Sequence, residues 1–304
     1  MFKTSAFTAT RLTLSTFLVK ETNDIFSEHP HIYVKLVPSS NTILVIDTGC
    51  GGKSNDKDVQ ITNLREFIET FPVDDNGGKP LNPKGTMKYV VATTHCHYDH
   101  ILAVEQFEGS MILASSHSPS FLSESNIPEN SLCNSLGIKA PSYSPTLVPH
   151  NFIIHSPDHN KTSLDVQILH TPGHTPDEIA LYDRSERMLY VGDTLYEEEP
   201  IIFPKEGSII IWLASVDALI SFVQSNQVAG EMVFLNAGHC TTRRDALETL
   251  RSTREFILDV VEGKETVKRR TTKRGEETVE YRQAGDRFSL ICPERLVIEA
   301  RQTL

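Results

Sequence analysis

The stretch that decides the fold is residues 94–100, which read Thr-His-Cys-His-Tyr-Asp-His. It holds three imidazoles and one carboxylate, and it follows an apolar run at residues 87–93 that has the composition of a buried strand. Imidazole nitrogen and carboxylate oxygen are both good ligands for Zn²⁺. This concentration of ligand types at the end of a strand predicts a metal site.

The spacing within this stretch divides its ligands between two ions. Alternate residues of an extended segment project to the same side, so His95 and His97 can bind one ion together. Asp99 and His100 lie about one turn further along the chain, where they can reach a second ion. Cys96 then points away from the ligands, and we expect it to be a packing residue.

The stretch resembles the signature of the metallo-β-lactamase superfamily, and the other parts of that family's pattern are found in chain order. They are Asp47, after a strand-like run, and three short segments that contain His174, Asp193 and His239. The segments read Thr-Pro-Gly-His-Thr, Gly-Asp-Thr and Ala-Gly-His. The resemblance covers roughly residues 11–240, and the parts together are far more specific than any one of them.

This resemblance implies an α/β fold, the αββα sandwich in which helices flank two mixed β-sheets. It also implies a site for two Zn²⁺ ions, with iron or manganese as alternative metals, and places Asp47 beside the metals, behind their ligands. The implied ligands are His95, His97 and His174 for one ion, Asp99, His100 and His239 for the other, and Asp193 between the two.

The implied reaction is hydrolysis by a hydroxide that bridges the metals. Two cations lower the pKa of bound water toward ~7, and Asp99 would orient the hydroxide and shuttle its proton. True β-lactamases of the family resemble one another in having Cys or Ser where this chain has Asp193. Penicillin hydrolysis is therefore disfavoured. The branches of the family with Asp at this position include lactonases and enzymes that open small cyclic amides, so we expect a hydrolase that opens a small lactam or lactone and that detoxifies a xenobiotic or plant metabolite.

Tyr196 is the candidate for a further catalytic side chain. It lies three residues after Asp193, a spacing that resembles the tyrosine by which lactonases of the family hydrogen-bond the substrate carbonyl. Its phenol could then stabilise the oxyanion of the reaction. Packing on the wall of the site is the alternative role for this ring.

Two other activities are consistent with the same resemblance. A glyoxalase II-like thioester hydrolase is the first, because its relatives recognise glutathione with basic residues near the C-terminus and this chain has a basic cluster at residues 268–274. A persulfide dioxygenase is the second, in which a similar set of histidines holds a single iron ion and Asp193 binds that ion alone. Metal analysis would separate these activities.

Composition limits the partners and the location of the protein. The formal net charge of −11 opposes binding to nucleic acid or anionic membranes, so we expect a small-molecule substrate. The 5 cysteines are odd in number and scattered, as in a protein of a reducing compartment. Residues 1–20 lack the continuous apolar run of a signal peptide. We expect a cytoplasmic protein that is a monomer or a homodimer.

The pattern along the chain predicts one domain over residues 1–304, with a charged C-terminal appendage at about 262–304 that begins with an exposed hairpin. Residues 116–150, rich in Ser, Pro and Asn, are expected to form a short helix followed by a long loop that could cover a substrate. Apolar periodicity predicts strands at 11–20, 31–37, 42–47, 87–93, 111–115, 152–155, 164–170, 178–182, 188–192 and 232–237, and helices at 61–71, 101–107, 209–223 and 243–261.

Overall fold

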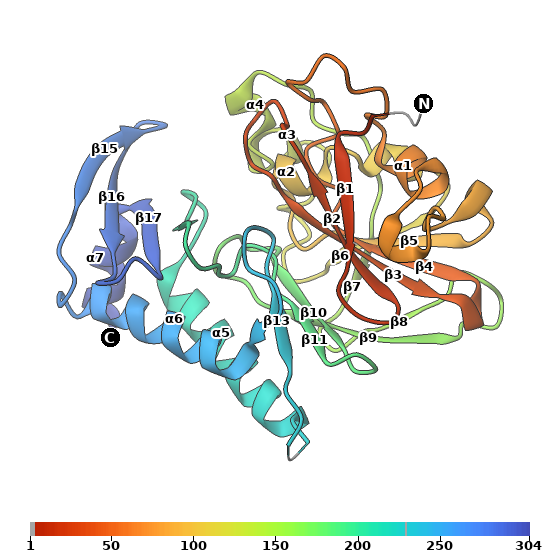
Figure 1. Ribbon diagram of the computed structural model, residues 1–304. Coiled ribbons are helices and arrows are strands. Elements are labelled where there is room, and N and C mark those ends of the chain that lie inside the picture. Colours follow the sequence, from red (N-terminus) through yellow and green to blue (C-terminus); the bar gives the residue numbers. More distant parts are fainter. Residues whose placement is uncertain (1–3, 229) are drawn as a thin grey trace. The chain divides into compact units, whose positions relative to one another are not determined.

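The computed structural model describes residues 4–228 and 230–304 and divides the chain into two compact units. The first unit ends at Ile168, and the second begins at Leu169. Both combine helices with strands (Figure 1), so the predicted α/β class is confirmed. The single domain predicted over residues 1–304 stays a prediction.

The first unit is built on a seven-stranded sheet whose strands follow one another in sequence order. The first four strands form an antiparallel meander, and the fourth to the seventh run parallel. All residues of the fourth strand are buried, as expected of a strand covered on both faces. The strands are β1 (Phe7–Arg11), β2 (Thr16–Glu21), β3 (His31–Val37), β4 (Thr42–Ile46), β5 (Lys88–Ala92), β6 (Met111–Ser115) and β7 (Thr146–Val148).

Short helices connect these strands. The longest, α1 (Leu64–Thr70), begins after Asn63, whose side chain accepts a hydrogen bond from the Glu66 N–H as an N-cap. Two further strands, β8 and β9, pair antiparallel where the first unit ends. The remaining elements of the unit are η1 (Pro38–Ser40), η2 (Asp74–Asn76), η3 (Pro83–Gly85), α2 (Tyr98–Ile101), η4 (Val104–Phe107), α3 (Ile127–Asn130), α4 (Cys133–Leu136), β8 (Ile153–His155) and β9 (Ser163–His170).

The carboxyl ends of β4 and β5 lie side by side. The two strands are parallel, with Ile46 opposite Ala92. One residue further on, the Asp47 N–H donates to the Ala92 carbonyl at 2.9 Å. Side chains that follow the two strands therefore meet at one edge of the sheet, where α/β proteins commonly place their ligands.

The second unit holds a mixed sheet and two long helices. β10 pairs antiparallel with β11, β11 pairs parallel with β13, and β13 pairs antiparallel with β14. Both helices begin at capping side chains, Ser208 and Asp245, which accept from backbone N–H groups of the first turn. The elements are β10 (Ile179–Asp183), β11 (Met188–Tyr190), β13 (Phe234–Asn236), β14 (Arg244–Asp245), α5 (Ile209–Asn226) and α6 (Ala246–Val261).

A further four-stranded sheet, in the order β12-β17-β16-β15, takes three strands from the C-terminal segment and one, β12, from residues 200–202. The predicted hairpin is confirmed, because β15 and β16 pair antiparallel and most of β15 is exposed. Val279, Tyr281 and Leu290 of this sheet belong to the same buried core as Trp212 of α5, so the segment packs into the unit. The four strands and the helix that follows them are β12 (Pro200–Ile202), β15 (Arg269–Lys273), β16 (Glu276–Arg282), β17 (Ser289–Pro293) and α7 (Glu294–Thr303).

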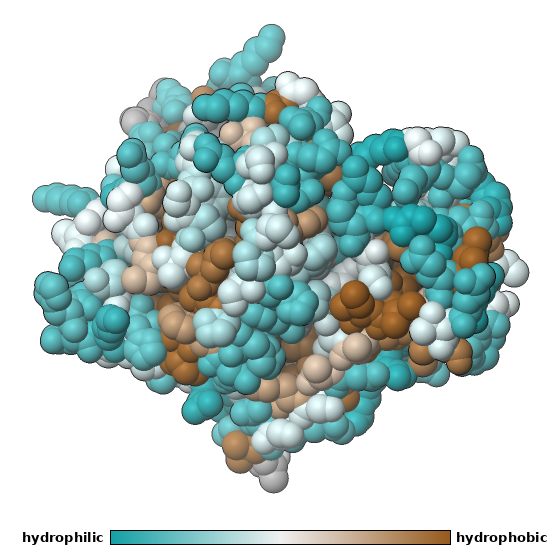
Figure 2. Space-filling model, turned by 180° about the vertical axis from the view of Figure 1, so that it is seen from behind, coloured by the Kyte–Doolittle hydropathy of each residue, from teal (hydrophilic) through white to brown (hydrophobic). Residues whose placement is uncertain are grey.

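α5 is long and apolar enough to cross a membrane by length and composition alone, with a mean hydropathy of 1.5. It also buries Trp212, Val216 and Leu219 in the core of its unit, as the core helix of a globular protein does. Most of the face seen in Figure 2 is hydrophilic, with apolar residues gathered in smaller patches.

Some predicted elements differ from those observed. The single strand predicted at 11–20 is two strands, β1 and β2, joined by a turn in which the Leu12 N–H donates to the Thr16 carbonyl. The helix predicted at 101–107 is not continuous: α2 ends at Ile101 and a separate 3₁₀ turn, η4, begins at Val104, while the Leu102 N–H between them donates to the carbonyls of both Tyr98 and Gly49. The predicted covering loop at 116–150 contains α3, α4 and β7, and its role stays a prediction.

Candidate metal centre

The first unit gathers four of the predicted ligands where β5 ends. After β5 the chain bends at Thr94 and His95, is extended at His97, and then enters α2, which carries Asp99 and His100. The ring centroids of His95 and His97 lie 4.6 Å apart, and those of His95 and His100 lie 4.2 Å apart. Asp99 Oδ2 lies 3.6 Å from His100 Nε2. All four side chains are buried.

Asp47 holds this segment in place from the neighbouring strand. Its carboxylate accepts from the Thr94 N–H at 2.7 Å and from the Thr94 hydroxyl at 2.8 Å. It also lies 2.8 Å from Nδ1 of His100. These contacts place the Asp47 carboxylate against His100 and Thr94, and its position behind bound metal ions stays a prediction.

The same hydrogen bonds fix which ring nitrogen of each histidine carries the proton. Nδ1 of His100 donates to the Asp47 carboxylate, which leaves Nε2 as the nitrogen with a lone pair. The Thr94 hydroxyl gives its only proton to Asp47, so it accepts from Nδ1 of His95 at 3.2 Å, and Nε2 of His95 keeps its lone pair too. Both rings are thereby prepared to bind a cation through Nε2.

The second unit supplies His174 from a loop that packs on the start of α5. The Gly173 carbonyl accepts from the Ser208 N–H at 2.8 Å, and the Pro172 carbonyl accepts from the Ser215 hydroxyl at 2.7 Å. A Cβ atom at Gly173 would lie 2.4 Å from Cα of Trp212. The glycine of the Thr-Pro-Gly-His-Thr segment is therefore needed for this close approach.

Asp193 lies between His174 and His239 in the second unit. Its Oδ2 is 4.0 Å from Nε2 of His174, and its Oδ1 is 3.6 Å from Nε2 of His239. The two carboxylate oxygens thus face different histidines, which is the arrangement that a bridging carboxylate needs. The loop of His239 is tied to the loop of Asp193 because the Gly238 N–H donates to the Gly192 carbonyl at 2.7 Å.

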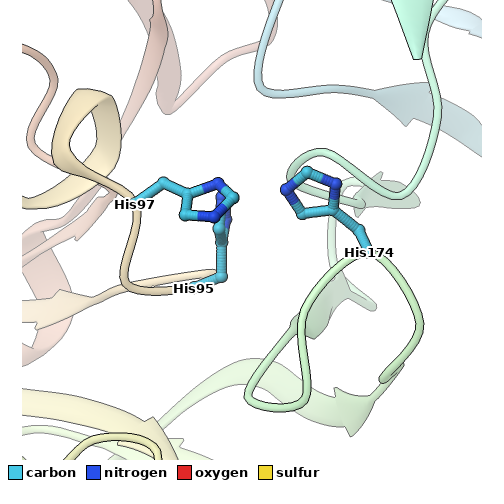
Figure 3. Close-up of side chains that lie close together, drawn as sticks. All are labelled: His95, His97 and His174. Carbon is cyan, nitrogen blue, oxygen red and sulfur yellow. The ribbon is translucent and has the colours of Figure 1, made fainter. Parts of the chain in front are cut away.

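The seven predicted ligands are divided between the two units, and every one is buried. The first unit holds His95, His97, Asp99 and His100, and the second holds His174, Asp193 and His239. Nitrogen and carboxylate oxygen donors of this kind fit Zn²⁺, and they also fit iron or manganese. Figure 3 shows the imidazoles of His95 and His97 close together on the segment that follows β5, and the imidazole of His174 on a loop of the second unit. The two groups of predicted ligands stay those that the resemblance implies: His95, His97 and His174, and Asp99, His100, Asp193 and His239.

Tyr196 is buried in the second unit. Its ring packs edge-on against the His239 ring, with the centroids 5.5 Å apart, and it belongs to the buried core. Contact with a predicted ligand is consistent with both roles considered for this residue, and its role in the reaction stays a prediction.

Two carboxylates beside the predicted ligands are buried; no role was predicted for Glu178 from the sequence, and Glu197 was expected to be exposed. Glu178 is fully buried and accepts from the Asp193 N–H at 3.0 Å; burial, and then the charges of Asp193 and Asp177, raise its pKa well above the usual value. Glu197 follows Tyr196 and is buried between arginines. The only sequence signal was position, since each acid lies within four residues of a predicted ligand.

The basic cluster at residues 268–274 lies on β15 and the turn after it. Arg269 and Lys273 line a shallow hollow on the C-terminal sheet, together with Thr271, Thr278, Val279, Glu280 and Ile291. The cluster is set in the four-stranded sheet and not in either group of predicted ligands.

Comparison with known proteins gives a family match and several relatives. A family model described as the metallo-beta-lactamase superfamily matches residues 34–251. An Aspergillus versicolor protein, provisionally named a transcription factor (avaE), is 33% identical over 311 residues, which cover 98% of this chain and 89% of that protein. The human acyl-coenzyme A thioesterase MBLAC2 is 26% identical over 189 residues, which cover 59% of this chain and 60% of that enzyme.

Solved structures share the fold at low identity. A metallo-beta-lactamase family protein from Thermus thermophilus, TTHA1429, superimposes with a TM-score of 0.58 at 15% identity, and covers 83% of this chain and 82% of its own. The metallo-beta-lactamase DIM-1 gives a TM-score of 0.52 at 14% identity, and covers 84% of this chain and 99% of its own. The predicted fold is thereby confirmed.

Proposed function

This chain belongs to the metallo-beta-lactamase superfamily and is a metal-dependent hydrolase, and from that premise we propose that it uses two Zn²⁺ ions to open a small lactam or lactone. The observation that carries the proposal is the position of Asp193, whose two oxygens face His174 and His239 separately. One carboxylate shared in this way supports a dinuclear site.

The proposed ligands are the two groups described above. His95, His97 and His174 would hold one ion, and Asp99, His100 and His239 would hold the other, with Asp193 shared. Zinc bound there would supply a nucleophile at neutral pH and polarise the attacked carbonyl. Asp47 supports this assignment, because its hydrogen bonds direct Nε2 of one histidine in each group toward a cation.

The chain's own residues would perform the proton transfer and stabilise the oxyanion. Asp99 would accept a proton from the attacking water at a carboxylate oxygen and deliver it to the leaving nitrogen or oxygen. The Tyr196 hydroxyl would donate to the oxygen that gains charge as the carbonyl is attacked. The contact between Tyr196 and His239 supports a place for this phenol beside the reacting atoms.

Elemental analysis together with a panel of lactams, lactones, acyl-CoA thioesters and glutathione thioesters tests the proposal. We expect close to two zinc ions per chain and turnover of a lactam or lactone. One iron ion without hydrolysis would contradict the proposal and favour the persulfide dioxygenase alternative. The class of substrate in the panel that is hydrolysed fastest identifies whether the enzyme cuts an amide, an ester or a thioester bond.

Thioester hydrolysis is the second candidate, and it is favoured by the similarity to acyl-coenzyme A thioesterase MBLAC2. The same two-metal site would serve, because a thioester carbonyl is attacked in the same way and has a better leaving group. Activity on thioesters alone would move the assignment to this candidate. Glutathione and coenzyme A thioesters in the panel separate the glyoxalase II type from the acyl-CoA type.

We propose no nucleic-acid partner, although the relative from Aspergillus versicolor is named as a transcription factor. The net charge of −11 opposes binding to a phosphate backbone, which depends on clustered Lys and Arg. All seven predicted metal ligands are retained, which supports catalysis. We propose a cytoplasmic enzyme that acts on a xenobiotic or plant metabolite, as a monomer or a homodimer.

A further inference from the structure

A buried carboxylate in the second unit holds two arginines that are distant in sequence. Glu197 has 6% of its surface exposed. Its Oε2 accepts from Nε of Arg244 at 2.8 Å, and its Oε1 accepts from Nε of Arg287, also at 2.8 Å. Arg244 lies in the segment after His239, whereas Arg287 lies in the turn before β17. One side chain therefore joins two parts of the unit.

The backbone around Glu197 makes further contacts with the same two segments. The Glu197 N–H donates to the Thr241 hydroxyl at 2.7 Å, and the Glu197 carbonyl accepts from Sγ of Cys240 at 3.0 Å. The Glu198 N–H donates to the Arg287 carbonyl at 2.8 Å. These bonds tie the residues that directly follow Tyr196 to the residues that directly follow His239.

Arg287 is fixed on its other side as well. Its two terminal nitrogens each lie 2.6 Å from an oxygen of Glu248, on α6, in a bidentate pair. The guanidinium also lies over the Phe288 ring, 4.8 Å from the centroid. A planar group held at three places can orient Glu197 in a way that a flexible ammonium cannot.

Loss of Arg287 would leave the buried Glu197 with one of its two cations. A buried carboxylate that loses a partner draws in water or changes its conformation, because burying an unpaired charge is costly. The segments that Glu197 joins would then be free to shift, and each carries a predicted site residue, Tyr196 or His239. Shifts of the supporting groups around a metal site commonly weaken metal binding.

We propose that Glu197 and Arg287 are positioning residues, which hold Tyr196 and His239 in place and make the C-terminal segment a working part of the site. Arg287 lies beyond residues 34–251, the part of the chain that matches the family model. Part of the support is thus supplied from outside the region that matches the family model. The inference rests on the proposed function, because it takes His239 as a metal ligand.

Zinc binding to the whole chain tests this inference without any substrate. Metal-free protein is titrated with Zn²⁺ against a chromophoric chelator, for the wild type, Arg287→Ala, Arg287→Lys and Arg254→Ala. Arg254→Ala is the matched control, because Arg254 also pairs with a carboxylate through two nitrogens, on Asp217 at the exposed surface. Circular dichroism and the thermal midpoint report on folding.

We expect Arg287→Ala to weaken binding of one zinc equivalent by about tenfold and to leave the other unchanged. Arg287→Lys should give a smaller loss, and Arg254→Ala none. If Arg287→Ala does not fold, Arg287→Lys becomes the deciding variant, and weaker binding of one zinc equivalent is again the expected result. Wild-type affinity for both ions in the deciding variant would overturn the inference, whereas a wild type that binds fewer than two zinc ions would overturn the proposed function instead.

Discussion

Asp47 has a backbone φ of +60°, a conformation that is uncommon for a residue with a side chain. The conformation places its carboxylate against Thr94 and His100, where it accepts three hydrogen bonds. Through Thr94 it also sets the protonated nitrogen of His95. One strained residue thus orients a histidine in each of the two groups of predicted ligands.

Asp47→Asn removes the charge of this residue and keeps a side chain that tolerates its backbone conformation. Asparagine adopts positive φ readily, so we expect a fold close to the wild type, but its amide is a weaker acceptor for the His100 proton. Zinc affinity should fall by about tenfold or more in a chelator competition. Asp47→Ala should in addition lower the thermal midpoint. Unchanged zinc affinity in both variants would show that Asp47 does not support the site.

His97→Ala tests a ligand directly. Because loss of an outer supporting group already costs about 10–100-fold, loss of a ligand should lower turnover by at least about a hundredfold. The fold should be mostly intact by circular dichroism, since His97 belongs to neither main buried core. Near-normal turnover of this variant on a confirmed substrate would contradict the two-metal mechanism.

The raised pKa of Glu21 leads to a prediction of how the stability of the protein depends on pH. Burial, as the largest cause, raises its pKa from 4.5 to about 8. Between these values the folded protein retains a proton that the unfolded chain has lost, so this residue makes stability fall as pH rises from about 4.5 to about 8. The free energy of unfolding of Glu21→Gln minus that of the wild type should be larger at pH 8.5 than at pH 5, by up to about a few kcal/mol. Urea unfolding of the metal-loaded protein measures it. An equal difference at both pH values would contradict the raised pKa.

At the scale of elements, the loop before His174 and the start of α5 are fitted to each other. The loop carbonyls accept hydrogen bonds from Ser208 and Ser215, and Gly173 lets the loop lie directly on Trp212. The position of His174 therefore depends on how α5 packs as well as on the loop itself.

Gly173→Ala should disturb this contact. The added methyl would overlap the backbone of Trp212, and we expect a loss of about 1–3 kcal/mol in the free energy of unfolding, with weaker zinc binding. Gly137→Ala is the matched control, because Gly137 also has a positive φ but nothing within 4 Å of the added Cβ. It should cost only about 1 kcal/mol and leave zinc binding unchanged. Equal effects of the two substitutions would exclude the steric explanation.

The hydrophobic pattern of the sequence predicted the bounds of an element correctly where all residues of the segment have a similar environment. β3 and β6 have the predicted bounds, because each is a short run of apolar residues with turn signals on both sides. The continuous helix predicted at 101–107 was wrong: α2 ends at Ile101, and at this break the Leu102 N–H also donates to the carbonyl of Gly49. The periodicity of apolar residues cannot reveal a contact such as this one, between two residues that are distant in sequence.

At the scale of the whole molecule, the predicted ligands come from both compact units, and each of them was proposed from a short local motif. Metal chemistry restricts the residue types at those positions, so a short segment carries the signal. The support of the site is different. Glu197 and Arg287 are ordinary charged residues, separated by 90 positions, and only the fold brings them together.

Metal binding should stabilise the molecule as a whole. Zinc that binds the folded chain and not the unfolded chain adds about 2.7 kcal/mol when its free concentration is a hundred times Kd. The thermal midpoint should therefore rise by several degrees on adding zinc to metal-free protein, and should fall again with a chelator. In the His97→Ala variant the rise should be smaller. A midpoint that does not respond to zinc in the wild type would contradict a buried metal site.

The outer strand of the C-terminal sheet also affects how copies of this chain meet one another. β15 is the last strand in the sheet order, so one of its edges has no neighbouring strand in that sheet. Unpaired strand edges are where proteins join into aggregates, and Lys or Arg along an edge opposes that joining by charge repulsion. The basic residues of β15, Arg269, Arg270 and Lys273, thus protect the protein from edge-to-edge polymerisation.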